Sequence, residues 1–454
     1  LLHILVEEGL EADIVVCNAA INACEKGQQW QLALSLFVGV QAQRLEPTVV
    51  TYGAAISACE RGRRWQEALD LLREAARSSL EPGLIAYGAA ISVCGRSQQW
   101  RSAVALLDEV CLLNLQPNLI IYNSALSALE TGQQWRCAIS LLTEMRQQRC
   151  DSDVITYNAV ISSCARCSQW RTAIMLLDSM SDTGPAPDVI SYSAAITSCR
   201  DSSSWRTALW LLSEMSSRSL QPNLVTYNAA ISSCEDRWEL AVDLLGQVRH
   251  SNSFKPDLIT FNSVISACET GQEWEVALLL LHELCEEALQ PDAISYSGVM
   301  GACERSRQWE LALDIFMGMQ GRLVLPDLHT YSAAVRACEK GKLWELALGL
   351  LAEARSGNLE LDMFSYNAAV GACQKGENWE AALCILSEVR QQVLQPDGIT
   401  YNAAISACLQ AQLWEPVLQL LKDAVQRGGL VPDVIAYGAA ISACDLSRQR
   451  EGAL

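Results

Sequence analysis

The sequence predicts an all-α protein: an α-α superhelix (solenoid) of about twelve 35-residue helix-turn-helix repeats. Near-copies of the stretch ITYNAAISAC, residues 399–408, recur along the whole chain. Each copy starts a repeat that holds two apolar stripes of helical spacing, and proline stands at the penultimate position of ten of the twelve repeats. One such hairpin cannot bury both of its stripes, so the repeats are expected to stack.

Aligned on the recurrent tyrosine, twelve complete repeats occupy residues 14–433. Ten of them have 35 residues, the seventh has 34 and the twelfth has 36. Residues 1–13 end an earlier, truncated repeat, and residues 434–454 hold the first helix of a truncated thirteenth. Because both ends fall inside a repeat, we expect the sequence to be a fragment. The repeats begin at Ile14, Val49, Leu84, Leu119, Val154, Val189, Leu224, Leu258, Ala293, Leu328, Met363 and Gly398.

The two helices of a repeat are predicted from their apolar stripes. In the first helix, positions four, eight and eleven lie on one face, as Tyr157, Ile161 and Cys164 do. The second stripe starts at a tryptophan at position seventeen and continues through positions twenty, twenty-one, twenty-four and twenty-seven. We therefore expect the tryptophans to belong to the core. One example of the second stripe is Trp309, Ala312, Leu313, Phe316 and Met319.

Cysteine is the usual residue at position eleven. Equivalent residues of stacked helices lie roughly 8–10 Å apart, whereas a disulfide needs Cα atoms within about 7 Å. These cysteines are therefore predicted to be small buried apolar residues in a reducing compartment. They are Cys24, Cys59, Cys94, Cys164, Cys199, Cys234, Cys268, Cys303, Cys338, Cys373, Cys408 and Cys444.

Charge and motifs restrict the function. The net charge of −19 argues by itself against a polyanion as partner. The apolar runs are far shorter than the ~18–20 residues that span a bilayer, so no membrane association is expected. The lone CARC motif at 164–167 lacks a second pair of ligands, and no nucleotide-binding or nucleophile motif is present. We expect no enzyme, no cofactor and no metal. The histidines are scattered: His3, His250, His282 and His329.

The consensus V-[IV]-T-Y-N-A-x-I-S-x-C … W-x-x-A-L-x-L-L-x-E-M … L-x-P-D resembles the pentatricopeptide repeat (PPR), and the constant period resembles its P class. The tryptophan at position seventeen departs from the family, which commonly has an aliphatic residue there. The resemblance implies a monomer that binds single-stranded RNA sequence-selectively, one base per repeat. It further implies a role in RNA processing, stabilisation or translation control in a mitochondrion or chloroplast, with a processing or translation factor as a further partner. The alternative is a solenoid scaffold for a protein or peptide, which the acidic charge favours.

The resemblance implies that positions five and thirty-five read the base. Asn with Asp would favour uracil, Ser with Asn adenine and Ser with Asp guanine, so repeats four to twelve would select 5′-UUAUUGGUU-3′. The residues alone allow a plainer interpretation, in which Asp places a negative charge before the next helix, where the helix dipole favours it, and Asn, Ser or Gly is an ordinary capping or surface residue. The predicted base-reading residues are Asn123, Asp153, Asn158, Asp188, Ser193, Asn223, Asn228, Asp257, Asn262, Asp292, Ser297, Asp327, Ser332, Asp362, Asn367, Asp397, Asn402 and Asp433.

The first three repeats depart from these combinations. Glycine has no side chain that could read a base, so the bases opposite these repeats are left open. Their pairs are Asn18 with Thr48, Gly53 with Gly83, and Gly88 with Asn118.

Two further positions are implied to contact RNA. Position two would clamp the base, although Val or Ile there is also a plain apolar choice; these residues are Ile120, Ile155, Ile190, Val225, Ile259, Ile294, His329, Phe364 and Ile399. Position thirteen would approach phosphate, although a solvated charge in the turn is an equally good interpretation. The basic residues there are Lys26, Arg61, Arg96, Arg166, Arg305, Lys340 and Lys375.

Overall fold

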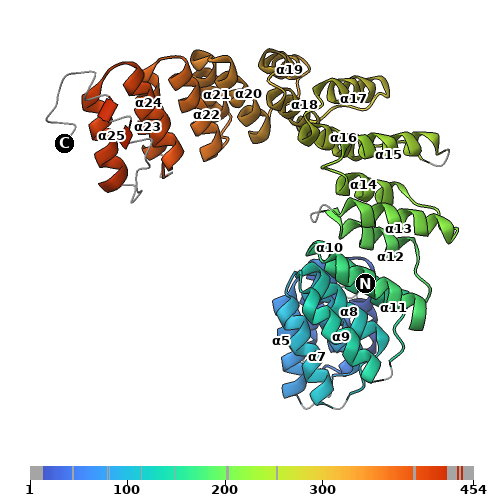
Figure 1. Cartoon of the computed structure of the whole chain (residues 1–454). Helices are drawn as coiled ribbons and strands as arrows, with labels where there is room; N and C mark the ends of the chain where they lie inside the picture. The colour runs from blue at the N-terminus through green and yellow to red at the C-terminus, as the bar shows by residue number, and fades with distance from the viewer. Residues whose placement is uncertain are drawn as a thin grey trace. The chain divides into compact units, whose positions relative to one another are not determined.

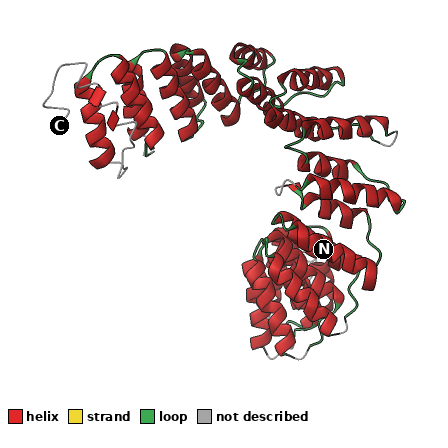
Figure 2. Cartoon of the chain, viewed as in Figure 1, coloured by secondary structure: helices red, strands yellow, loops and turns green. Residues whose placement is uncertain are grey.

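A computed structural model gives the fold, and its regular elements are all helices in the part of the chain that it describes (Figures 1 and 2). The chain divides into two compact units, Leu1–Ser233 and Cys234–Leu454, here called the N-terminal and C-terminal units. None of the helices described is both long and apolar enough to cross a membrane. The described residues are 14–42, 45–78, 80, 82–113, 115–148, 150–200, 204–251, 254–391, 395–426, 437–438 and 441–442.

The first helix of every complete repeat begins at the residue that the sequence predicts. In the N-terminal unit these helices are α2 (Ile14–Lys26), α4 (Val49–Gly62), α6 (Leu84–Arg96), α8 (Leu119–Thr131), α10 (Val154–Arg166), α12 (Val189–Thr197) and α14 (Leu224–Ser233). In the C-terminal unit they are α16 (Leu258–Gly271), α18 (Ala293–Arg305), α20 (Leu328–Gly341), α22 (Met363–Lys375) and α24 (Gly398–Gln410).

The second helix of every repeat begins at its tryptophan. The N-terminal unit holds α3 (Trp30–Ala42), α5 (Trp65–Arg77), α7 (Trp100–Leu112), α9 (Trp135–Gln147), α11 (Trp170–Thr183) and α13 (Trp205–Ser217). The C-terminal unit holds α15 (Trp238–His250), α17 (Trp274–Glu286), α19 (Trp309–Gly321), α21 (Trp344–Ser356), α23 (Trp379–Gln391) and α25 (Trp414–Gln426). The division between the units therefore falls inside the shortened seventh repeat, between α14 and α15.

Within each unit the first helices form the continuous layer of the stack. Each first helix contacts the first helix of the next repeat, and each second helix contacts its own first helix and the one that follows. The predicted stripe of the first helix is buried, as Tyr157, Ile161 and Cys164 show. No disulfide joins the cysteines that the structure describes. Burial raises the pKa of the Cys59 thiol to about 12, so that it is a neutral apolar group at physiological pH. Cys444 lies outside the described residues.

The prediction that the tryptophans belong to the core was wrong. Every tryptophan at position seventeen is only half-buried, and Leu313 at position twenty-one is half-buried as well. The fully buried stripe of the second helix runs through positions twenty, twenty-four and twenty-seven, as Ala312, Phe316 and Met319 show. The physical reason is that the tryptophan is the first residue of its helix and lies at the edge of the layer, beside the link.

Five of the tryptophans pack against a glycine of the next repeat, where the first helix ends. Trp309 covers Gly341, and a Cβ atom at Gly341 would lie 2.6 Å from the Trp309 ring. A side chain at Gly341 would have to displace the indole, which occupies that space. The same contact recurs as Trp30 on Gly62, Trp100 on Gly132, Trp238 on Gly271 and Trp344 on Gly376.

Aspartates cap several first helices. Asp397 accepts hydrogen bonds from the Thr400 backbone N–H at 2.9 Å and the Thr400 hydroxyl at 2.7 Å, at the start of α24. Partial burial alone would raise the pKa of Asp397, but these bonds and one from Asn367 outweigh it and hold the pKa below its ordinary value. Position thirty-five is thus a helix cap in these repeats, a role that goes beyond the charge–dipole effect expected from the sequence.

Replacing Gly341 with alanine is expected to destabilise the α19–α21 region by about 1–3 kcal/mol, because the new methyl group overlaps the Trp309 ring. Hydrogen exchange of the amides in these helices, followed by mass spectrometry, measures the change. Gly349→Ala is the matched control, since nothing lies within 4 Å of the added Cβ. It should leave stability unchanged or raise it by about 0.5–1 kcal/mol. Equal effects of the two substitutions would refute the packing contact.

Asp397→Ala is expected to cost about 0.5–2 kcal/mol of local stability at neutral pH, because it removes the cap of α24. The folded-state pKa of Asp397 is depressed, so its stabilisation is present above the ordinary carboxyl pKa and is lost as the pH falls through the folded value. The difference between parent and variant should therefore shrink as the pH falls below the ordinary carboxyl pKa, in hydrogen-exchange or thermal measurements. Asp314→Ala, an exposed site on α19, should show no such difference at neutral or low pH.

Candidate nucleic-acid interface

The second residue of each first helix forms a row of exposed apolar side chains. The exposed fraction of these side chains ranges from 59% at Ile190 to 83% at Ile85. His329, at the same position, is exposed as well. Large aliphatic residues are normally buried, so a side chain of this kind exposed at the same position in repeat after repeat marks a candidate contact surface. The remaining members of the row are Val15, Val50, Ile120, Ile155, Val225, Ile259, Ile294, Phe364 and Ile399.

Four of the predicted Asn–Asp reader pairs lie side by side beneath this row. In each pair, the side-chain amide at position five donates a hydrogen bond to the carboxylate at position thirty-five. Because position five lies three residues after position two, both share one face of the first helix. The pairs are Asn123–Asp153 at 3.3 Å, Asn158–Asp188 at 3.2 Å, Asn262–Asp292 at 3.1 Å and Asn367–Asp397 at 3.0 Å.

A third residue completes each of these pairs, and the sequence interpretation missed it. Thr156, at position three of the next repeat, is fully buried, and its hydroxyl lies 2.7 Å from Asn123 Oδ1 and 2.7 Å from Asp153 Oδ1. A hydroxyl has one proton, so it can donate to only one of these oxygens at a time. The available signal was a Ser or Thr directly before the aromatic residue in nine of the twelve repeats. The same arrangement recurs around Ser191, Ser295 and Thr400.

The carboxylates of three junctions, those of Asp153, Asp188 and Asp397, are held ionised. For Asp153, partial burial acts to raise the pKa, but hydrogen bonds from the Thr156 side chain and backbone and from Asn123 lower it below the ordinary value. The same balance lowers the pKa of Asp188. Position thirty-five therefore presents a hydrogen-bond acceptor throughout the physiological pH range.

Serine at position five is joined to its predicted partner indirectly. Ser193 is only 8% exposed, and its hydroxyl donates to the Val189 carbonyl while it lies 2.7 Å from the Thr226 hydroxyl. Thr226 in turn donates to Asn223 Oδ1 at 2.8 Å. The buried hydroxyl therefore links this reader pair.

Of the other two serine readers, Ser332 is buried and Ser297 is partly exposed. Ser332 is 5% exposed and contacts the Ser365 hydroxyl at 2.7 Å, and Ser365 donates to Asp362. Ser297 lies 3.0 Å from the Ile294 carbonyl of its own helix, and the carboxylate predicted to pair with it, Asp327, caps α20.

Besides these, the chain has two further Asn–Asp pairs and the pairs of the glycine-bearing second and third repeats. Asn228 and Asp257 belong to different units, and Asp433, the predicted partner of Asn402, lies outside the described residues. In the second and third repeats the predicted readers are mostly glycine. The residues that occupy position three beside them, Ala86 and Ile121, have no hydroxyl, so the junction network cannot form there.

Four of the seven cations at position thirteen are paired with glutamates at position twelve of the preceding repeat. These contacts join neighbouring repeats a second time, beside the reader face. Burial raises the pKa of Glu130 and Glu269, and the paired arginines act against this. The pairs are Arg96–Glu60 at 3.0 Å, Arg166–Glu130 at 3.7 Å, Arg305–Glu269 at 3.2 Å and Lys375–Glu339 at 2.7 Å.

Two of the residues predicted to contact phosphate remain accessible. Lys26 and Lys340 are exposed and form no ion pair with any residue that the structure describes. Nothing is described of the Arg61 side chain. Most of the predicted phosphate-contacting cations thus already have a carboxylate neighbour.

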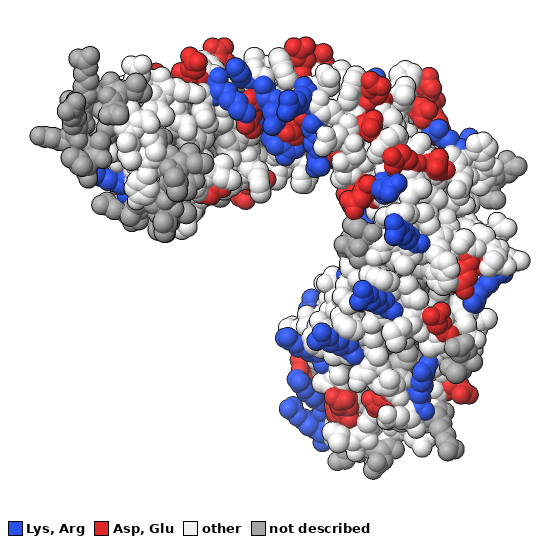
Figure 3. Space-filling view, in the orientation of Figure 1, with Lys and Arg blue, Asp and Glu red and all other residues white. Residues whose placement is uncertain are grey.

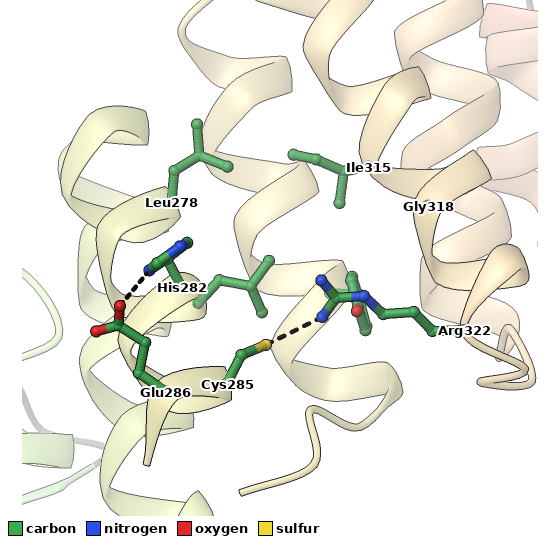
Figure 4. Close-up of a pocket in the computed structure, with 9 residues that line it drawn as sticks. Leu278, His282, Cys285, Glu286, Ile315, Gly318 and Arg322 are labelled. Atoms are coloured by element: carbon green, nitrogen blue, oxygen red, sulfur yellow. Dashed lines mark hydrogen bonds and ion pairs between the residues drawn. The ribbon is translucent and has the colours of Figure 1, made fainter. Parts of the chain in front are cut away.

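Other clusters of polar side chains lie away from this face. A pocket of the C-terminal unit lies between α17 and α19, where Arg322 Nη1 donates to Cys285 Sγ at 3.0 Å and His282 lies 3.5 Å from Glu286 (Figure 4). In the CARC motif, Cys167 donates its thiol to the carbonyl of Gln133, while Cys164 is buried. Among the described residues no group of three His, Cys, Asp or Glu side chains is arranged to hold a metal ion.

Comparison with known proteins agrees with this geometry. The chain is similar over its full length to the crystal structure of the pentatricopeptide repeat protein PPR10 from maize, with 19% identity, a TM-score of 0.66 and 74% of that chain covered. The structure of PPR10 in complex with an 18-nt psaJ RNA element matches with 20% identity and a TM-score of 0.50, over 99% of this chain and 80% of that one. A search of curated proteins finds no significant match.

Models of one repeat family match along more than half of the chain. The model described as PPR repeat family matches residues 117–166 and 152–201, and the model described as PPR repeat matches residues 50–80 and 399–429. The pentatricopeptide repeat domain model matches residues 1–62, 279–340 and 349–410. The helical hairpins, their 35-residue period and these matches establish that the chain belongs to the pentatricopeptide repeat family.

Proposed function

We propose that this protein binds single-stranded RNA sequence-selectively, with one base read by each repeat from the fourth to the twelfth. The observation that carries the proposal is the recurrence of four Asn–Asp pairs in one geometry, each next to an exposed apolar residue at position two. The RNA-bound structure of PPR10, to which the chain is similar, supports it.

The chemistry of each pair suits a base edge. The Asn amide uses one of its two protons on the carboxylate, and the Asp carboxylate has further acceptor capacity, so a donor and an acceptor remain for the base. The exposed residues at position two would lie against the base faces, where contacts with the planar residues His329 and Phe364 contribute about 1–3 kcal/mol per base. Because the junction hydroxyl already holds the readers in place, little side-chain freedom would be lost on binding.

The biological role that we propose follows from RNA binding itself. A repeat array, residues 14–433, without catalytic machinery acts by occupying an RNA strand, which blocks nucleases, opens a hairpin or guides a processing or translation factor. We place this role in a mitochondrion or chloroplast and assign the chain to the P class, since ten of its repeats have 35 residues. A monomer suffices for this mechanism.

The paired substitution Ser193→Asn with Asn223→Asp is expected to change the preference of the sixth repeat from adenine to uracil. An Asn at 193 would accept from Thr226 as Asn158 accepts from Ser191, and it would donate to the new carboxylate. Titrations with 5′-UUAUUGGUU-3′ and with its variant carrying uracil at the third letter measure the change, at about 1–3 kcal/mol per mismatch. An unchanged preference would show that these side chains do not read the base.

Glu339→Gln is expected to tighten RNA binding at low salt, because it releases Lys375 from its ion pair and leaves the cation for a phosphate. The slope of log affinity against log salt should steepen by about 0.7. Glu345→Gln removes the same charge from an exposed site on α21 and is the matched control. If both variants change affinity equally, net charge alone acts and position thirteen does not contact phosphate.

A further inference from the structure

The charge of the residue at position eighteen, the second residue of every second helix, changes sign along the array. It is glutamine in the first two repeats, arginine in repeats three to six and glutamate in repeats seven to twelve. The arginines are Arg101, Arg136, Arg171 and Arg206, here called the arginine row. The glutamates are Glu239, Glu275, Glu310, Glu345, Glu380 and Glu415.

The arginine row lies entirely in the N-terminal unit, and its members share one setting. All four side chains are exposed, and each guanidinium lies 5.0–5.2 Å from the ring centre of the tryptophan that precedes it. None of them forms an ion pair within the part of the chain that the structure describes, unlike the paired arginines at position thirteen. The row thus presents four fixed, uncompensated positive charges.

Helix stability does not explain these arginines. A cation in the first turn of a helix is disfavoured by the helix dipole, whereas an anion there is favoured, each by about 0.3–1 kcal/mol. The helices α7, α9 and α11 also lack a side-chain cap at this end. The glutamates at position eighteen of the C-terminal unit carry the negative charge that the helix dipole favours there. The tryptophans that precede them, such as Trp309 and Trp344, pack on glycine with a glutamate in place of the arginine beside them. A cation–π contact is therefore not needed to hold the indole in place.

The charges repeat at the spacing of the stack. Neighbouring helices pack about 8–10 Å apart, which is close to the Debye length at physiological salt, so successive arginines repel one another unless an anion lies between them. The N-terminal unit has 17 basic and 22 acidic residues, against 16 and 30 in the C-terminal unit. In Figure 3, basic groups recur along the visible face of the N-terminal unit, while acidic groups are frequent along that of the C-terminal unit.

We infer that the arginine row is a phosphate-binding strip that holds the RNA backbone independently of sequence. The inference rests on the proposed RNA binding and adds a second contact surface to it. Phosphodiesters fit the row because four equally spaced guanidinium groups match a polyanion, and arginine binds phosphate through two parallel N–H donors. The uncapped first turns of the same helices add the N–H groups that favour anions at a helix N-terminus.

The strip would hold the RNA beside repeats whose residues at position five cannot select a base. The second and third repeats have glycine at position five and cannot read a base through that residue. A backbone contact beginning at the third repeat would retain the RNA there without specifying its sequence, while the later repeats select it.

The test replaces all four arginines of the row with glutamine and measures binding of a random-sequence single-stranded RNA pool over a range of salt. The slope of log affinity against log salt should fall by about two to three, because each phosphate that the row neutralises contributes ~0.7 to it. Sequencing of the retained RNA should show unchanged base preferences. The matched control removes the same charge from exposed sites of the N-terminal unit away from the row. Three of them lie on second helices and the fourth directly follows α13: Arg73→Gln, Arg77→Gln, Arg146→Gln and Arg218→Gln.

The outcomes separate the strip from the proposed function. If the parent binds the pool and the two quadruple variants behave alike, or if the row retains an acidic protein instead of RNA, the strip is refuted while RNA binding by the reader face stands. If the parent retains no RNA even at low salt, the proposed function and the strip both fall. Circular dichroism of both variants checks that neither change in binding reflects unfolding.

Discussion

The buried hydroxyl at position three is the contact on which the junctions between reader-bearing repeats depend. At the junction between α8 and α10, Thr156 joins Asn123 of one repeat to Asp153, the residue that caps the next helix. A buried hydroxyl without partners would destabilise the stack by about 1–3 kcal/mol, so its neighbours are constrained to be hydrogen-bonding groups. The side chains that would read a base are therefore also those that satisfy the junction, and this limits their identity to a few small polar residues.

The need to pair buried polar groups between repeats also explains where the cations at position thirteen find their partners. Glutamates at position twelve are partly buried against the following repeat and are offset by cations such as Arg96 and Lys375. These pairs stabilise the stack and at the same time reduce the positive charge available to a polyanion. A protein with a net charge of −19 is then expected to hold RNA best where cations lack a carboxylate partner, as at Lys26 and Lys340 and along the arginine row.

The repeat period predicts many features of the fold, because the same sequence pattern occurs in every repeat and can be compared among all of them. The start of every first helix and the buried tyrosine and cysteine stripes followed from spacing. The pairing of Asn123 with Asp153 followed from the family resemblance and not from spacing. The half-buried tryptophans, the junction hydroxyls and the glutamate partners followed from neither. Each of these depends on a contact between residues more than thirty positions apart in successive repeats, and periodicity gives the face of a helix but not its neighbour. Trp309 is fixed by Gly341, which carries no apolar side chain and so left no signal in the stripe.

The central claim is that positions five and thirty-five form a reader in each repeat from the fourth to the twelfth. Selection of the parent protein's ligands from a random single-stranded RNA pool tests it most directly. The account predicts enrichment of one contiguous run, 5′-UUAUUGGUU-3′, with weak preference at the bases on its 5′ side, opposite the glycine-bearing repeats. Enrichment of a run that no register of the repeats reproduces, or retention of RNA without any base preference, would contradict it.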